Sequence, residues 1–173
     1  MNNFFAYVQQ VELMTFFSGY TLLYAIINVI AGDKESGNYF KKNIISVLPL
    51  SYALICSLYL GLFLKNLYVN YSAGNVNLVI YHPYLVTWAF LAILFWIPVF
   101  RKKVVLTLPH SVVFFFILVK DLVIQIASEV DANILKNDMK IFTASFLLNL
   151  AAFTVMGIFY FTLMRNKKGF KYS

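Results

Sequence analysis

Long apolar runs alternate with short polar connections along almost the whole chain. The runs cover residues 11–31, 44–68, 84–100, 104–127 and 141–164. A helix needs about 20 apolar residues to cross the hydrocarbon core of a bilayer. Within that core only a helix or a closed barrel satisfies its own backbone groups. The pattern therefore predicts an all-α, polytopic integral membrane protein with five transmembrane helices, forming a single domain over residues 1–173.

The connections between the runs contain the turn-forming and charged residues. Residues 32–38 read GDKESGN, which is typical of a turn. Residues 101–103 are all basic and make a tight turn, and residues 128–140 are expected to form a solvated loop. Pro49 is expected in the first turn or two of the second helix, where a missing backbone donor costs least.

Composition supports a membrane environment. The chain is 61% hydrophobic and only 12% charged, with a mean hydropathy of +0.76, so it has too little polar surface to cover a soluble globule. Its net charge of +7 does not indicate nucleic acid, because the basic residues flank apolar runs. One cysteine, Cys56, permits no internal disulfide. We expect no cleaved signal peptide, since the first residues lack a basic region.

Lysine and arginine are distributed unequally among the connections. Residues 32–43, 101–103 and 165–173 hold ten of them, whereas residues 128–140 hold two and residues 70–83 none. Basic residues favour the cytoplasmic side of a membrane. The distribution predicts an N-terminus outside and a C-terminus in the cytoplasm, in the plasma or inner membrane.

The fourth run carries polar residues inside the predicted crossing. At about 100° per residue, one side of this helix holds polar residues near both ends and apolar residues in the middle. The polar positions within about 60° of one another are Thr107, His110, Asp121, Gln125 and Ser128. Lys120 is directed about 80° away from this polar side, so we do not expect it and Asp121 to share a partner by stacking along the helix.

The predicted threading brings several polar residues to the outer half of the membrane. We hypothesise a polar cluster of Glu12, Lys65, Lys120, Asp121, Gln125 and Asn149. Acids and bases at a common depth neutralise one another, which lowers the cost of charge in hydrocarbon. The alternative is structural: long side chains near helix ends reach the interface, or the cluster holds helices or subunits together. Asp121, with its short side chain, is the residue least easily explained by this alternative.

Two further sets of residues have a predicted role. His110, Phe114 and Ile117 on the fourth helix are candidates for a gate or an inner polar site, with the phenylalanine as part of a dry constriction. Their alternative role is ordinary packing. Ala53, Ser57 and Gly61 recur every four residues and form a ridge of small side chains, which is typical of close helix packing.

Three function classes follow from these residues. The first is an oligomer that forms or regulates a channel or transport passage, and the second is a non-catalytic accessory subunit that stabilises a larger membrane complex. The third is an intramembrane enzyme, which the sequence disfavours because it contains no HExxH motif and no phosphate-binding glycine loop. A Schiff-base role for Lys120 stays open.

We expect no cofactor, no metal and no nucleic-acid partner. His82 is predicted at the outer surface and His110 about 10 Å in from the inner one, too far apart to ligate one haem within a chain. The expected partners are the lipid bilayer and either further copies of the chain or a larger membrane complex. Residues 70–72 match a glycosylation acceptor, Asn70 being the modified position, which matters only in a eukaryotic secretory route.

Overall fold

The structure is a computed structural model that describes residues 2–32, 38–72, 82–127 and 132–169. Side chains are described for residues 6–30, 44–69, 82–124, 126–127 and 139–163. In this part of the chain every regular element is a helix. Four helices are long and apolar enough to cross a membrane, and a fifth apolar helix is shorter. The all-helical fold predicted from the apolar runs is confirmed.

The first apolar run forms two helices that meet end to end. α1 (Asn2–Phe17) and α2 (Gly19–Gly32) are separated at Ser18, and together they contain an apolar span, Ala6–Ile30. The helical segment begins before residue 11, where the sequence predicted its start. The break at Ser18 was not predicted.

α3 (Asn38–Ser72) contains the predicted second helix and extends it at both ends. Its apolar span is Ile44–Val69. Pro49 therefore lies roughly three turns inside the helix, and the expectation of a position near the helix start was wrong. The reason is local, because residues 38–43 contain no glycine or proline and continue the helix backwards.

The third apolar run is divided by its backbone geometry. It forms α4 (Pro83–Phe90), the 3₁₀ helix η3 (Leu91–Trp96) and the short α5 (Pro98–Arg101). A proline starts each α-helical piece, where its fixed φ suits the first turn. The larger rise of a 3₁₀ helix stretches α4 and η3 to about 24 Å, short of the roughly 30 Å hydrocarbon core.

The last two apolar runs form a pair of long helices. After the 3₁₀ turn η4 (Val104–Leu106) comes α6 (Thr107–Ala127), which matches the predicted fourth helix. α7 (Ala132–Gly169) is much longer than the predicted fifth helix. The expected solvated loop over residues 128–140 was wrong from Ala132 onward, because the residues that follow it contain no helix breaker.

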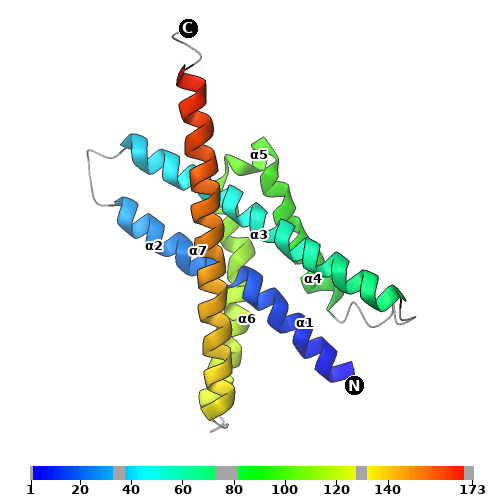
Figure 1. Ribbon diagram of the computed structural model, residues 1–173. Helices are drawn as coiled ribbons and strands as arrows, with labels where there is room; N and C mark the ends of the chain where they lie inside the picture. Colours follow the sequence, from blue (N-terminus) through cyan, green and yellow to red (C-terminus); the bar gives the residue numbers. More distant parts are fainter. Residues whose placement is uncertain (1, 33–37, 73–81, 128–131, 170–173) are drawn as a thin grey trace.

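The helices cross as two oblique groups (Figure 1). α1–α2 and α3 run diagonally in opposite directions, while α6 and α7 form a steeper pair, and α7 packs against α1, α2 and α3. Successive helices alternate between the two ends of the bundle: the ends of α2 and α7 and all of α5 lie in the upper half of the view, whereas the ends of α3 and α6 lie in the lower half. This alternation agrees with a five-helix arrangement.

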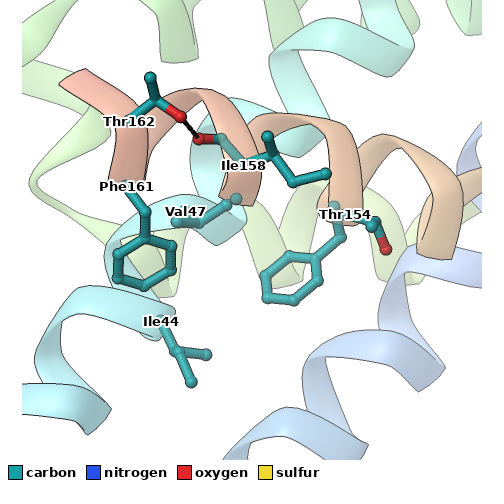
Figure 2. A pocket seen from close by; sticks show the side chains of 8 residues that line it. Ile44, Val47, Thr154, Ile158, Phe161 and Thr162 are labelled. Carbon is teal, nitrogen blue, oxygen red and sulfur yellow. Dashed lines mark hydrogen bonds between the residues drawn. The ribbon is translucent and has the colours of Figure 1, made fainter. Parts of the chain in front are cut away.

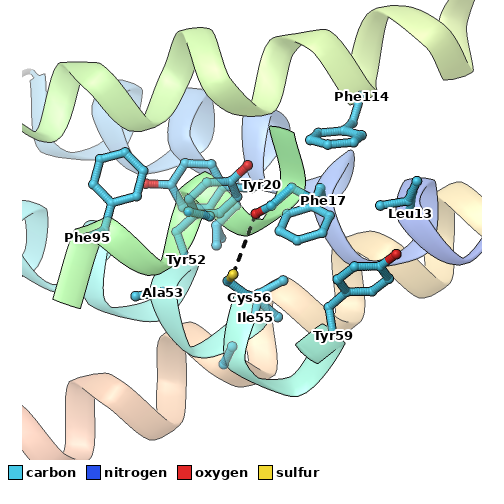
Figure 3. Packing of buried hydrophobic residues seen from close by; sticks show 14 of the residues in the cluster. Leu13, Phe17, Tyr20, Tyr52, Ala53, Ile55, Cys56, Tyr59, Phe95 and Phe114 are labelled. Atoms are coloured by element: carbon cyan, nitrogen blue, oxygen red, sulfur yellow. Dashed lines mark hydrogen bonds between the residues drawn. The ribbon is translucent and has the colours of Figure 1, made fainter. Parts of the chain in front are cut away.

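Aromatic side chains fill the centre of the bundle (Figure 3). The ring of Phe17 stacks on that of Phe114 at a centroid distance of 4.9 Å, and the rings of Tyr20 and Tyr52 lie 4.2 Å apart. All four side chains are fully buried. The outward face of α6, by contrast, carries exposed apolar residues such as Val113, as expected for a surface in contact with lipid.

Candidate functional site

His110 is the polar centre of the aromatic core. It lies in the first turns of α6 and is only 6% exposed. Its Nδ1 is 2.7 Å from the hydroxyl of Tyr52 in α3, and its Nε2 is 2.6 Å from the backbone oxygen of Trp88 in α4. One histidine thus connects three helices.

The carbonyl of Trp88 determines the tautomer of His110. A carbonyl oxygen only accepts, so Nε2 must carry the proton and donate it. In the neutral ring Nδ1 then accepts from the Tyr52 hydroxyl. The indole N–H of Trp88 returns a hydrogen bond to the backbone oxygen of His110 at 3.1 Å, and the two rings stack at 5.1 Å with an interplanar angle of 7°.

The surroundings of His110 give it no room for a ligand. Both ring nitrogens already have hydrogen-bond partners, and the rings of Phe17, Phe95 and Phe114 surround the imidazole. Phe114, one of the predicted gate residues, is fully buried against Phe17, and Ile117 packs between two parts of the core. In this arrangement the three residues hold helices together.

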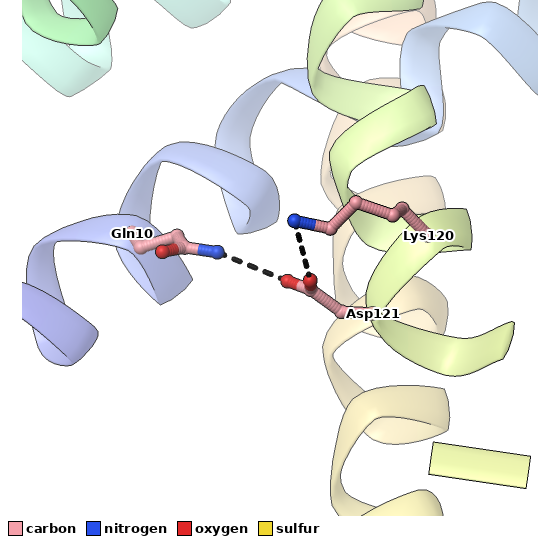
Figure 4. A network of polar contacts seen from close by, with 3 residues as sticks. All are labelled: Gln10, Lys120 and Asp121. Atoms are coloured by element: carbon pink, nitrogen blue, oxygen red, sulfur yellow. Dashed lines mark hydrogen bonds and ion pairs between the residues drawn. The ribbon is translucent and has the colours of Figure 1, made fainter. Parts of the chain in front are cut away.

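Asp121, a second polar residue that the sequence analysis named on α6, contacts Lys120 and Gln10 (Figure 4). Its Oδ2 accepts a hydrogen bond from Gln10 Nε2 in α1 at 3.0 Å, and its Oδ1 lies 3.3 Å from Lys120 Nζ. Both residues belong to the predicted polar cluster. Their side chains meet although they leave the helix in different directions, because the lysine chain is long enough to curl around the helix. Their side chains are 53% and 24% exposed, respectively.

The other predicted cluster residues are spread over the bundle. Glu12 accepts a hydrogen bond from Asn66 Nδ2 of α3 at 3.4 Å, and Lys65 is exposed. Asn149 is buried elsewhere, against α1. The side chain of Gln125 lies outside the described side chains. The structure thus brings Lys120 and Asp121 together and adds Gln10. The sequence argument missed Gln10 because it lies just before the first predicted helix.

The break between α1 and α2 is a polar contact with α7. Ser145 Oγ accepts from the backbone N–H of Gly19 at 2.8 Å and donates to the backbone oxygen of Met14 at 3.1 Å. Asn149 Nδ2 donates to the backbone oxygens of Phe16 and Ser145, each at 2.9 Å. Side chains of α7 therefore bond backbone groups at the break, which explains how an interrupted helix is tolerated.

The predicted ridge of small residues is only partly a contact surface. Ala53 is fully buried, and the hydroxyl of Ser57 accepts a hydrogen bond from the Trp96 indole at 3.0 Å. Gly61 is exposed, and a Cβ placed there would meet nothing within 4 Å. The close helix approach occurs instead at Gly19, where a Cβ would lie 2.5 Å from the backbone N of Phe146.

A groove of about 500 Å³ runs between α3 and α7 on the outside of the bundle (Figure 2). Its walls are almost entirely apolar, with two threonines. The lining residues are Ile44, Val47, Phe153, Thr154, Gly157, Ile158, Phe161 and Thr162. The sequence argument did not anticipate this groove, because it depends on how two helices cross.

Fold and composition together define a multi-pass integral membrane protein. Across the described residues no group of three or more histidine, cysteine or acidic side chains is arranged to hold a metal ion. The chain matches no protein-family model, no curated protein and no solved structure. Its function must therefore be argued from its own residues.

Proposed function

We propose that this protein is a non-catalytic subunit of a larger membrane assembly, in which the Lys120–Asp121 pair forms part of the contact with a partner helix. The supporting observation is the position and exposure of that pair. Asp121 belongs to the apolar span Val104–Ile124, yet its side chain is 24% exposed and that of Lys120 is 53% exposed. Charged groups that face hydrocarbon are costly, and a polar partner surface would cover them.

The interior of the bundle favours this assembly role over catalysis. The His110 ring, the Ser145 hydroxyl and the Asn149 Nδ2 all form hydrogen bonds that join helices of the same chain. His110 is enclosed by aromatic rings and has no free ring nitrogen for proton transfer or metal binding. The buried polar groups therefore stabilise one packing of the helices, which is what a subunit that presents a fixed surface requires.

A passage between copies of the chain is the second candidate, and the same exposed pair supports it. Repeated copies could bring several Lys120–Asp121 pairs around one axis. The burial of His110 and Phe114 weighs against a continuous path along α6, since the polar side of that helix faces its own bundle around Thr107 and His110. A passage along it would require the bundle to open.

The test is Asp121→Asn, purified in mild detergent with everything that associates with it. The amide keeps the size of the carboxylate and can still accept from Gln10, but it removes the ion pair with Lys120. We expect the wild-type chain to retain a second polypeptide at constant ratio and Asp121→Asn to lose it. Glu12→Gln is the matched control, because Glu12 is also a hydrogen-bonded carboxylate within a span, and it should retain the partner.

The outcomes separate the two candidates. A homo-oligomer that conducts ions in liposomes, with conduction changed by Asp121→Asn, would replace the subunit proposal by the passage proposal. Normal assembly and normal conduction in Asp121→Asn would remove both roles from this residue.

A further inference from the structure

The groove between α3 and α7 ends where both helices leave the apolar zone. Ile44 lines the groove and directly follows the polar residues Lys41, Lys42 and Asn43 in the sequence. Thr162 lines it from the other side and lies three residues before Arg165. The groove therefore opens at a membrane boundary, and from there it follows α7 inward as far as Phe153, over about 14 Å.

Basic residues stand immediately beyond this opening on both helices. Lys41 and Lys42 come just before Ile44 in α3, and α7 continues past Leu163 through three further basic residues, which are Arg165, Lys167 and Lys168. Neither residues 38–43 nor residues 164–173 contain an acidic residue. Within these two stretches the charge is thus of one sign, and Asp33 and Glu35 lie in the connection that precedes residue 38.

We propose that the groove binds an anionic diacyl phospholipid, with one acyl chain between α3 and α7 and the phosphate headgroup beside the basic residues. Basic pockets between transmembrane helices are known to take anionic headgroups, and each nearby Lys or Arg contributes about 1 kcal/mol to attraction by an anionic surface. The inference does not depend on the proposed subunit role, since it uses a different face of the molecule.

The lining of the groove favours a lipid chain over a polar partner. The hydroxyl protons of Thr154 and Thr162 are already donated to the backbone oxygens of Leu150 and Ile158 in α7. The remaining lining residues have no polar side-chain atom. Apart from its basic opening, the groove therefore has no side-chain donor with which to recognise a polar segment.

Gly157 provides a direct way to fill the groove. It lines the groove, and a Cβ placed there would meet nothing within 4 Å. Gly157→Leu should therefore place its side chain in the groove, with a Cβ that meets no protein atom. Gly61→Leu is the matched control, because Gly61 is also a glycine inside a helix with open space around its Cβ, but it does not line the groove.

The experiment measures retained lipid by native mass spectrometry after titration with phosphatidylglycerol or phosphatidylcholine of the same acyl composition. We expect the wild-type chain to retain phosphatidylglycerol preferentially. Gly157→Leu should lose that retention, whereas Gly61→Leu should keep it. Removing two charges in Arg165→Gln/Lys168→Gln should weaken phosphatidylglycerol retention by roughly fivefold per charge. Lys102→Gln/Lys103→Gln is the matched charge control and should leave retention unchanged.

Melting curves of each variant show whether it is folded before its lipid retention is compared. Equal retention of the two lipids by the wild-type chain would overturn the proposal. So would equal effects of the two glycine variants, or equal effects of the two charge variants, since either result would place the lipid elsewhere. The charge variants lie outside the apolar spans, so their result stands even if Gly157→Leu does not fold.

Discussion

The backbone N–H of Gly19 donates a hydrogen bond to Ser145 Oγ at 2.8 Å, at the point where the interrupted first helix crosses α7. This contact joins residues far apart in the chain and leaves no room for a side chain at position 19. A Cβ there would lie 2.5 Å from the backbone of both Ser145 and Phe146. Because the obstruction is backbone, a side-chain rotation cannot relieve it.

Gly19→Ala should destabilise the protein by about 1–3 kcal/mol or more, since overpacking a close contact forces helices apart. The measurement is thermal unfolding in detergent, followed with a thiol-reactive fluorescent dye. Cys56 is the only cysteine and is fully buried, so its reaction with the dye reports unfolding.

Gly61→Ala is the control for Gly19→Ala. The added Cβ meets open space, and alanine is favoured over glycine inside a helix by roughly 0.8–1 kcal/mol. Its melting temperature should stay unchanged or rise. Equal melting temperatures of Gly19→Ala and Gly61→Ala would contradict the close approach of the two helices at Gly19 and Ser145.

Tyr52→Phe tests the hydrogen bond to His110. The change removes the hydroxyl that donates to Nδ1 and leaves a buried acceptor without a partner, at a cost of about 1–3 kcal/mol. The same dye assay should show a lower melting temperature. The second single variant is His110→Leu, which removes the acceptor of the same hydrogen bond.

The double variant Tyr52→Phe/His110→Leu separates the hydrogen bond from general packing. If the two side chains are bonded, the free-energy losses of the single variants should not add, and the coupling should be about 0.5–3 kcal/mol. Strictly additive losses would contradict a direct bond between them.

Asn149→Asp tests the polar contact at the break between α1 and α2. Asn149 donates to two backbone oxygens and is 1% exposed. An aspartate loses both donors and brings a carboxylate against two carbonyls, so we expect a loss of about 3 kcal/mol or more. Asn28→Asp is the control, because Asn28 makes a local bond to the backbone of Tyr24, and it should cost less. Equal losses would show that the contact with Phe16 carries little free energy.

The apolar runs predicted the helices because hydrophobic length is a property of sequence alone. Interruptions and extensions were harder, since they depend on what surrounds the backbone. α1 ends just before Ser18. There the side chains of Ser145 and Asn149, both in α7, form hydrogen bonds with the end of α1. The Ser18–Gly19 dipeptide is a local turn signal, but it lies inside an otherwise apolar run, so the sequence prediction continued the helix through it.

The candidate site shows the same division between what sequence does and does not determine. Helix periodicity placed His110 and Asp121 on one side of α6, and both make contacts with other helices. Depth along the helix axis can be estimated from residue number, but the rotation of each helix toward its neighbours cannot. Asp121 therefore meets Gln10, and Glu12 meets Asn66, in place of the single predicted cluster.

The predicted orientation depends on whether the short third apolar unit crosses the membrane. α4 and η3 together span about 24 Å, so length alone does not decide it. If this unit did not cross, the three basic residues 101–103 would lie on the same side as residues 70–83, and the ten-to-two distribution of basic residues would be lost. The charge distribution thus favours a crossing, with a bilayer thinned locally around it.

Single-cysteine labelling in a Cys56→Ala background tests this threading. Ser72→Cys and Lys102→Cys stand on either side of the short unit, and a membrane-impermeant maleimide distinguishes the two faces of intact cells. We expect Ser72→Cys to react in intact cells and Lys102→Cys to react only after permeabilisation, since basic residues favour the cytoplasmic side. Reaction of both in intact cells, or of neither, would place them on one side, reduce the number of crossings to four and overturn the predicted orientation.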